Sequence, residues 1–137
     1  MKEIFLDANV LIDIISDRNV EKTGIDKIGS IKYKNIFCSS LSVHILFYIC
    51  KIKFDSIEDK RAKNILKFFN IISLSDEIIK KSFKFPYSDY EDTLQYLCAL
   101  DEKCSYILTR NKKDFEKIKK VIPSEIEIIT NISQINQ

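Results

Sequence analysis

The architecture of the chain is first indicated by the stretch Ile4-Phe5-Leu6-Asp7-Ala8-Asn9-Val10-Leu11-Ile12-Asp13. Its apolar run is too short to span a membrane and ends at a carboxylate, and the apolar residues from Val10 to Ile15 recur at helical spacing. The pattern therefore changes from strand to helix at Asp7. Strand ends of open α/β sheets form crevices for ligands and metals, so Asp7 is the first candidate ligand. In a second interpretation, Asp7 or Asn9 only caps the helix.

Length and composition predict one domain over residues 1–137. The chain is 45% hydrophobic and 31% charged, with 2 Gly and 2 Pro, a balance typical of a helix-rich globular protein without long linkers. The N-terminus has no signal-peptide pattern, and no apolar run approaches the ~20 residues of a membrane span. We therefore expect a cytoplasmic protein that does not contact a membrane.

The four cysteines, Cys38, Cys50, Cys98 and Cys104, lack C-x-x-C spacing and have apolar neighbours. Zinc binding or a disulfide framework is therefore disfavoured, and we expect reduced, mostly buried thiols. The formal net charge of +2 does not identify a nucleic-acid-binding protein. Any basic surface must be local, as at residues 110–113 and 117–120.

Apolar runs alternate with helical patterns along the chain. After the first strand, we expect strands at 36–38, 70–74, 106–108 and 127–129. Seven helices are expected. The first follows Asp7, and a short second one ends near Ile31. The third begins at Ser39, Ser40 or Ser42, the fourth covers 54–69, the fifth begins at Ser75, the sixth opens at 87–92, and the seventh is short and runs through Phe115. This alternation predicts a parallel sheet with right-handed crossovers.

Three helix faces are predicted to be buried. The helix after Ser39 has little polar face between Val43 and Ile49, the helix over 54–69 carries an apolar stripe that includes Phe54, Ile57 and Phe68, and the helix after Ser75 should turn Phe83 inward. The single histidine, His44, has no Cys or carboxylate at ligand spacing, so a surface or hydrogen-bonded role is favoured over metal binding.

Carboxylates from distant positions are expected to meet at one edge of the sheet. Asp7 follows the first strand, Asn111 and Asp114 follow the fourth, and Asp92 opens the helix that leads into it. Two carboxylates ~4 Å apart repel by about 4 kcal/mol at an effective dielectric of ~20, and a hard divalent cation removes that cost. Oxygen-only ligands suit Mg²⁺ or Mn²⁺, which stabilise charge on a phosphodiester and lower the pKa of water.

Each of these residues also has a structural interpretation. Ser88-x-x-Glu91 fits a capping box, which favours a structural role for Glu91. Asp89 could equally be the cap, with Asp92 placed favourably in the first turn. Asn111 could cap its own helix, with Asp114 three residues later.

Three segments in order resemble the successive motifs of PIN-domain proteins, notably the VapC-like toxin branch. They are Phe5-Leu6-Asp7-Ala8-Asn9-Val10-Leu11-Ile12-Asp13, Asp89-Tyr90-Glu91-Asp92-Thr93-Leu94-Gln95 and Tyr106-Ile107-Leu108-Thr109-Arg110-Asn111-Lys112-Lys113-Asp114-Phe115. The resemblance spans nearly the whole chain. It implies a three-layer α/β/α, Rossmann-like fold with a five-stranded parallel sheet, and Mg²⁺- or Mn²⁺-dependent RNA cleavage by water.

The resemblance also implies roles by motif position. Asp7 and Asp92 match the metal-binding acids of the family, and Asn111 and Asp114 match its last acidic position and a close neighbour. We take these four as candidate catalytic residues, and Asp7, Asp92 and Asp114 as metal ligands, with Asp89 as an additional one.

Two positions depart from the pattern. Ile45 stands on the third helix where the family usually carries an acid, and Asn111 stands where many members have Asp. Asp89 or Glu91 could supply oxygen ligands in their place.

The leading hypothesis is a metal-dependent endoribonuclease that acts as the toxin of a toxin-antitoxin pair. Arg110, Lys112 and Lys113 would guide RNA, and the expected partners are RNA, a small DNA-binding antitoxin and a second copy of the chain. The alternative, favoured by Ile45, is a degenerate PIN domain that binds RNA or protein without cutting. A nucleotide-binding domain is disfavoured, because Gly24 and Gly29 cannot build a glycine-rich phosphate loop.

Overall fold

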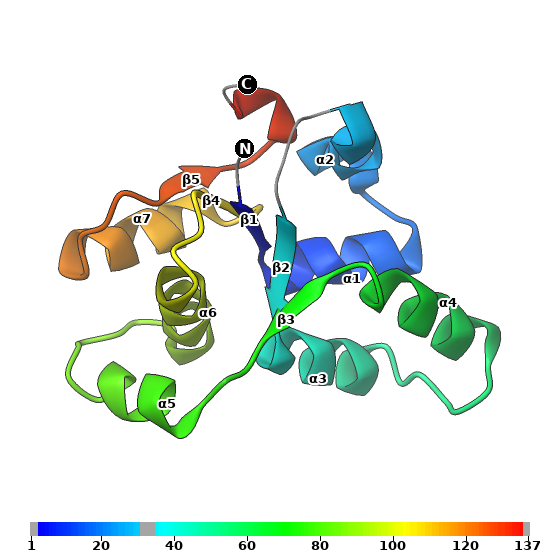
Figure 1. Ribbon diagram of the computed structural model, residues 1–137, viewed down its shortest axis with the longest axis horizontal. Coiled ribbons are helices and arrows are strands. Elements are labelled where there is room, and N and C mark those ends of the chain that lie inside the picture. The colour runs from blue at the N-terminus through cyan, green and yellow to red at the C-terminus, as the bar shows by residue number, and fades with distance from the viewer. Residues whose placement is uncertain (1–2, 31–34, 136–137) are drawn as a thin grey trace.

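The computed structural model describes residues 3–30 and 35–135 and contains a five-stranded sheet with the order β3-β2-β1-β4-β5 (Figure 1). Every pair of neighbouring strands is parallel, as predicted. The strands are β1 (Glu3–Leu6), β2 (Asn35–Ser39), β3 (Asn70–Ile72), β4 (Tyr106–Leu108) and β5 (Glu127–Ile129). The chain fills one half of the sheet from β1 to β3 and then returns to the other side of β1, so the strand order reverses between β1 and β4.

Alternating side chains of the strands pack into cores on the two faces of the sheet. Phe5, Ile107 and Ile128 belong to the core on one face, whereas Ile4 and Leu108 belong to the core on the other. Both faces are therefore buried, which explains why the central strands are apolar at every position rather than at every second one.

Helices cover both faces of the sheet and make three layers. Figure 1 shows α5, α6 and α7 on one side and α1, α2, α3 and α4 on the other. The helices of the described residues are α1 (Ala8–Ser16), α2 (Val20–Thr23), the 3₁₀ helix η1 (Ile25–Ser30), α3 (Ser40–Ile49), α4 (Ile57–Leu66), α5 (Asp76–Ser82), α6 (Tyr90–Asp101), α7 (Lys112–Val121) and the 3₁₀ helix η2 (Ile132–Gln134). The predicted three-layer α/β/α fold is confirmed.

Some predicted boundaries differ from the observed ones. The second helix divides at Gly24, whose φ of 73° ends α2 before η1 begins; Ile31, its expected end, lies outside the described residues. Strand β3 stops at Ile72, two residues early, and α7 continues to Val121, well beyond Phe115. Of the cysteines, which are all reduced, Cys50 is half-buried and the other three are buried.

The predicted burial of three apolar helix faces is wrong in part. Tyr48 and Ile49 at the end of α3, Phe83 after α5, and Phe54, Ile57 and Phe68 around α4 are largely exposed. Only Leu46 of α3 is fully buried among its large apolar side chains, because a helix lying on a sheet buries one stripe of its surface. Apolar composition alone does not place a side chain in the core.

Within the described parts of the chain, no helix has the length and apolar character that crossing a membrane requires.

Candidate active site

Asp7 lies where the strand order of the sheet reverses. Leu6 of β1 pairs in register with Leu108 of β4, so Asp7 and Thr109 follow neighbouring strands. Asp7 Oδ2 accepts a hydrogen bond of 2.8 Å from Thr109 Oγ1, and Oδ1 accepts one of 2.8 Å from the amide of Ala8. The Asp7 carboxylate therefore has a fixed orientation in the crevice that such a reversal creates.

Burial raises the pKa of Asp7 above its ordinary value, and the negative charge of Asp89 raises it further. The hydrogen bonds from Thr109 and Ala8 and the positive charge of Arg110 oppose this rise. Asp7 is only 1% exposed, so desolvation dominates. Asp7 does cap α1 as the structural interpretation required, but capping occupies one carboxylate oxygen and leaves the other facing Thr109.

Asp92 has an uncompensated carboxylate beside this site. It lies in the first turn of α6, where its backbone amide is held by the Asp89 side chain at 3.0 Å. The residue as a whole is 4% exposed, and no described residue donates a hydrogen bond to its carboxylate or pairs with it. Burial, together with the charges of Asp7, Asp89, Glu91 and Asp114, raises the pKa of Asp92 to about 7.

Three carboxylates of α6 and its cap lie within coordination range of one ion. One oxygen from each of Asp89, Glu91 and Asp92 lies within 4.8 Å of the others. Asp89, rather than Ser88, caps the helix, so the predicted capping box is absent and Glu91 does not serve as its second member. Burial and the charges of Asp7 and Asp89 raise the pKa of Glu91.

Asn111 and Asp114 lie at the start of α7. Among the charges that raise the pKa of Asp92, that of Asp114 has the smallest effect, and Asp114 is not one of the three carboxylates within 4.8 Å. Asn111 is the residue before α7, but its side chain makes no capping hydrogen bond. Its backbone amide donates to Thr109 Oγ1 at 2.9 Å, so Thr109 connects Asn111 to Asp7.

This donor set fits a hard divalent cation. The groups are all carboxylate oxygens, the carboxylate of the buried residue Asp92 has no partner, and the like charges raise the pKa of Asp92 and of Glu91. A buried carboxylate without a cation or donor is costly, and an oxygen-binding cation removes that cost. Of the predicted ligands, Asp89 and Asp92 belong to the group of three carboxylates within 4.8 Å, together with Glu91, whereas Asp7 and Asp114 lie outside that group and act on Asp92 through their charge.

Arg110 has a structural partner that the sequence analysis did not identify. Its Nε lies 3.0 Å from Asp13 Oδ2, and Arg18 approaches the other oxygen of Asp13 at 3.7 Å. Asp13 is completely buried, whereas the Arg110 side chain is 33% exposed. Arg110 therefore compensates a buried carboxylate, and only part of its guanidinium faces solvent.

Lys112 and Lys113 lie on an open, basic groove along α7. The groove has a volume of about 490 Å³ and is lined by Lys112, Lys113, Glu116, Lys117 and Lys120. With four lysines and one glutamate, the groove carries a net positive charge and is suited to binding phosphate. The sequence analysis named residues 117–120 as a local basic segment, and the spacing of three and four residues places Lys117 and Lys120 with Lys113 on one face of the helix.

Ile45 places no oxygen in the site. It is half-buried and packs against an apolar cluster that includes Leu11 and Leu46. One turn earlier on α3, Ser42 joins a buried polar network in which Gln95 donates to Ser42 Oγ at 2.8 Å and accepts from Ser39 Oγ at 2.7 Å. This network joins the start of α3 to α6 one turn below Asp92.

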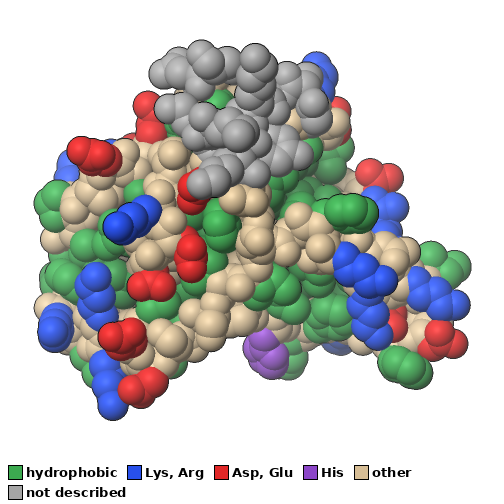
Figure 2. Space-filling view, in the orientation of Figure 1, with side chains coloured by type: hydrophobic (Ala, Val, Ile, Leu, Met, Phe, Trp, Pro, Cys, Tyr) green, Lys and Arg blue, Asp and Glu red, His purple; other side chains and the backbone are tan. Residues whose placement is uncertain are grey.

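His44 is exposed and stacks on Tyr48, with ring centroids 6.3 Å apart. Figure 2 shows this single histidine at the lower edge of the face, apart from the acidic side chains. The sequence-based preference for a surface role agrees with this position.

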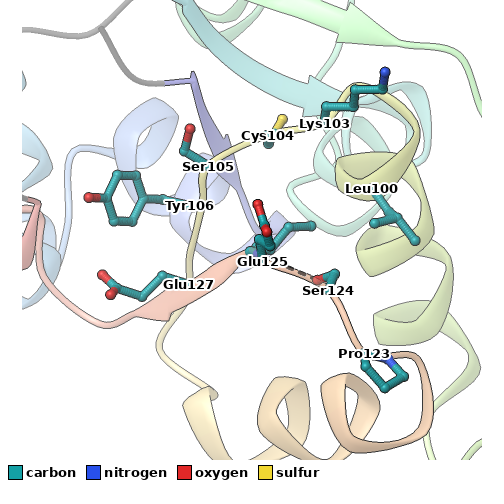
Figure 3. Close-up of a pocket in the computed structure, with 10 residues that line it drawn as sticks. Leu100, Lys103, Cys104, Ser105, Tyr106, Pro123, Ser124, Glu125 and Glu127 are labelled. Carbon is teal, nitrogen blue, oxygen red and sulfur yellow. Dashed lines mark hydrogen bonds between the residues drawn. The ribbon is translucent and has the colours of Figure 1, made fainter.

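A pocket of about 630 Å³ lies at the opposite edge of the sheet, where β4 and β5 begin. In Figure 3, Tyr106 and Glu127 point to one side of this pocket, and Leu100 and Pro123 lie on the other. Its polar groups do not converge as the carboxylates do. The acidic cluster is therefore the better candidate site.

Thr109 and Asp13 are the residues with site contacts to which the sequence analysis gave no role. Thr109 could have been found from symmetry, because it follows β4 as Asp7 follows β1 and parallel strands in register place both at one edge. Asp13 gave no such signal, because its partner Arg110 is 97 residues away along the chain.

Comparison with known proteins identifies similar chains. The family model described as PIN domain matches residues 3–113. Ribonuclease VapC1 of Aquifex aeolicus (strain VF5) is 27% identical over 134 residues, covering 90% of this chain and 92% of that protein.

Two similar solved structures have the same fold. VapBC2 from Rickettsia felis, bound to a DNA fragment from its promoter, aligns with a TM-score of 0.67 at 18% identity, covering 92% of this chain and 98% of that chain. DNA-bound VapBC from Salmonella typhimurium aligns with a TM-score of 0.63 at 17% identity, covering 93% and 98%. At these identities the structures establish the likeness of fold.

Proposed function

The chain belongs to the PIN-domain family, and on that premise we propose that it is a metal-dependent endoribonuclease that hydrolyses RNA phosphodiester bonds. The observation that carries the proposal is the unpartnered carboxylate of the buried residue Asp92 among the charges of Asp7, Asp89, Glu91 and Asp114. A protein gains nothing in stability from such a cluster, because each like charge adds repulsion. A cation site that serves catalysis explains it.

The roles of the side chains follow from their positions. Bound Mg²⁺ or Mn²⁺ supplies stabilisation of negative charge on the phosphodiester and lowers the pKa of a water molecule. Asp7 and Asp92, with Asp114 and Asp89, provide the oxygens that hold the cation. Thr109 orients Asp7 through its 2.8 Å hydrogen bond.

RNA is bound beside this cluster through its phosphates. Lys112 and Lys113 lie in the first turn of α7, the same turn as Asp114. An RNA strand that follows the basic groove therefore passes the carboxylates. Asn111, immediately before these lysines, would contact the RNA or the reacting water through its side-chain amide, which makes no capping hydrogen bond.

The biological role we propose is that of a toxin held inactive by a small DNA-binding antitoxin, in an assembly that includes a second copy of the chain. The similarity to Ribonuclease VapC1 supports this role. So does the likeness of fold to a protein of a toxin-antitoxin complex from Klebsiella pneumoniae, which is 22% identical with a TM-score of 0.65.

A second candidate function is RNA or protein binding without cleavage. The observation that favours it is Ile45, which contributes an apolar contact to the α1–α3 packing and no oxygen to the cluster. Under this alternative the remaining carboxylates would bind a cation too weakly to support hydrolysis.

Cleavage of structured RNAs with Mn²⁺, with Mg²⁺ and with EDTA tests the proposal. We expect Mn²⁺- or Mg²⁺-dependent cleavage that Asp92→Asn abolishes and that Asp101→Asn, at the far end of the same helix, preserves. RNA binding without cleavage under all three conditions would support the second candidate.

A further inference from the structure

A second depression continues the basic groove along α7 toward the C-terminal end of that helix. Its volume is about 270 Å³, and it is lined by Pro86, Tyr87, Ser88, Lys117, Ile118 and Val121. Lys117 lines this depression and the basic groove alike. The two hollows therefore form one track along α7, bounded on one side by the segment between α5 and α6.

Tyr87 offers an aromatic face that is held in place. Its ring lies 4.9 Å from the ring of Tyr90 at an interplanar angle of 54°. Tyr90 is fixed in turn, because its hydroxyl is 2.8 Å from the Oγ of the buried Ser82. Tyr87 remains 58% exposed, so part of its ring is available to a ligand.

The position of Tyr87 relates this face to the proposed site. Tyr87 is two residues before Asp89, whose carboxylate belongs to the acidic cluster. Across the depression, Lys117 is one helical turn after Asp114. A ligand held between Tyr87 and Lys117 therefore contacts the two segments that carry Asp89 and Asp114.

We infer that Tyr87 and Lys117 form a subsite for one unpaired nucleotide of the RNA, with the base stacked on Tyr87 and its phosphate paired with Lys117. This inference rests on the proposed function, and it specifies that the nuclease binds an unpaired part of its RNA substrate. Paired bases are covered by their neighbours in a helix and cannot stack on a side chain, so the subsite favours loops and single strands. Because stacking is tolerant of base identity, it selects unpaired RNA rather than one sequence.

Binding in EDTA tests the inference without cleavage. The probes are a fluorescent RNA hairpin with an unpaired loop that carries 2-aminopurine, and a fully paired duplex of the same stem. Tyr87→Leu should weaken hairpin binding about tenfold, the typical loss for one base-aromatic stack, and reduce the quenching of 2-aminopurine. Tyr87→Phe should keep both, since the ring remains.

Two matched controls isolate the subsite. Tyr48→Leu removes another exposed tyrosine, on α3, and should leave hairpin binding unchanged. Lys117→Ala should weaken hairpin and duplex alike and lower the salt dependence of both, whereas Lys81→Ala on α5 should not.

The inference is overturned if Tyr87→Leu binds the hairpin as tightly as Tyr87→Phe, or if it weakens hairpin and duplex equally. Loss of self-association in Tyr87→Leu by sedimentation, with hairpin binding intact, would assign the face to a protein contact and also overturn it. These results leave the proposed nuclease in place provided that wild type binds and cleaves RNA. Absence of RNA binding by wild type would instead contradict the proposed function itself.

Discussion

Arg110 Nε lies 3.0 Å from Asp13 Oδ2, and this ion pair ties α1 to the segment that follows β4. The Asp13 carboxylate is fully buried, and the second guanidinium contact, from Nη2 to Oδ1, is 3.4 Å. Arg110 lies between Thr109, which donates a hydrogen bond to Asp7, and Asn111, the residue before α7. The pair therefore positions the part of the chain that joins the carboxylates to the basic groove.

The first prediction is that Arg110 contributes mainly to the stability of the fold and little to RNA affinity. Arg110→Ala leaves the buried Asp13 carboxylate with only Arg18, at 3.7 Å, and should lower the free energy of unfolding by about 3 kcal/mol. Arg110→Ala combined with Asp13→Asn should recover part of that loss, because no unpaired charge remains. Urea unfolding of both variants measures the free energy of unfolding. If Arg110→Ala lowers that free energy by less than 1 kcal/mol but strongly weakens RNA binding, Arg110 acts mainly in RNA binding.

The second prediction concerns Lys112 and Lys113, which the sequence analysis assigned to RNA binding. Changing both to Ala should weaken binding to all RNAs and reduce the slope of log affinity against log salt by about 1.4, because each phosphate contact on a single strand contributes ~0.7. A salt titration of binding measures the slope. Lys80→Ala with Lys81→Ala on α5 is the matched control, and an unchanged slope in the Lys112 and Lys113 variant would place the RNA surface elsewhere.

The third prediction is a pH dependence of stability without metal. The pKa of Asp92 is about 7 in the folded protein, whereas an unfolded aspartate titrates near ~3.9, so between these values the folded state binds more protons. The free energy of unfolding in EDTA should therefore fall as pH rises from about 4 to about 7, on the order of 2 kcal/mol. The raised pKa values of Asp7 and Glu91 act in the same direction.

Urea unfolding across this pH range measures the effect, with Asp92→Asn as the comparison. The variant should be more stable than wild type at pH 8 in EDTA and should show a flatter profile. The prediction is contradicted if the free energy of unfolding of wild type and that of Asp92→Asn rise by the same amount from pH 5 to pH 8. The acidic cluster would then not destabilise the metal-free fold.

The fourth prediction uses Ile45 to separate the two candidate functions. Ile45→Glu puts a carboxylate into half-buried, apolar surroundings and should lower the melting temperature in EDTA. Ile45 is one turn beyond Ser42, which is bonded to Gln95 below Asp92, so the new carboxylate should reach the cluster and Mn²⁺ should restore the melting temperature. Ile45→Gln should lose stability without any restoration, and equal loss in both variants with and without Mn²⁺ would place Ile45 in the core alone.

The sequence predicted the fold because its signals are local. The apolar run of β1 followed by Asp7, and the similar run before Thr109, identify parallel strands, and the alternation with helices identifies their connections. Burial was predicted less well, since Phe54 and Phe83 have the residue type of a core but lie where no element covers them. Coverage depends on how helices pack, which periodicity does not specify.

The sequence predicts Asp7, Asp92 and Asp114 at one edge of the sheet because strand ends and helix starts share that edge. The carboxylates that lie within 4.8 Å of one another are those of Asp89, Glu91 and Asp92, and the common site with Asp7 and Asp114 stays a prediction. Arg110 could not be assigned to Asp13, because the two residues are 97 positions apart and their contact depends on how α1 packs against the segment after β4. Thr109 was overlooked because its hydroxyl is uncharged, and a threonine in the sequence gives no indication that it orients a carboxylate.

The central claim is that the acidic cluster binds a divalent cation, and the most direct measurement is anomalous diffraction from crystals of the protein grown with Mn²⁺. The account predicts one anomalous peak within ligand distance of at least two of the carboxylates of Asp7, Asp92 and Asp114, and its absence in Asp92→Asn crystals treated in the same way. A well-ordered wild-type site with no peak, or with these carboxylates turned apart and each capping its own helix, would contradict the account.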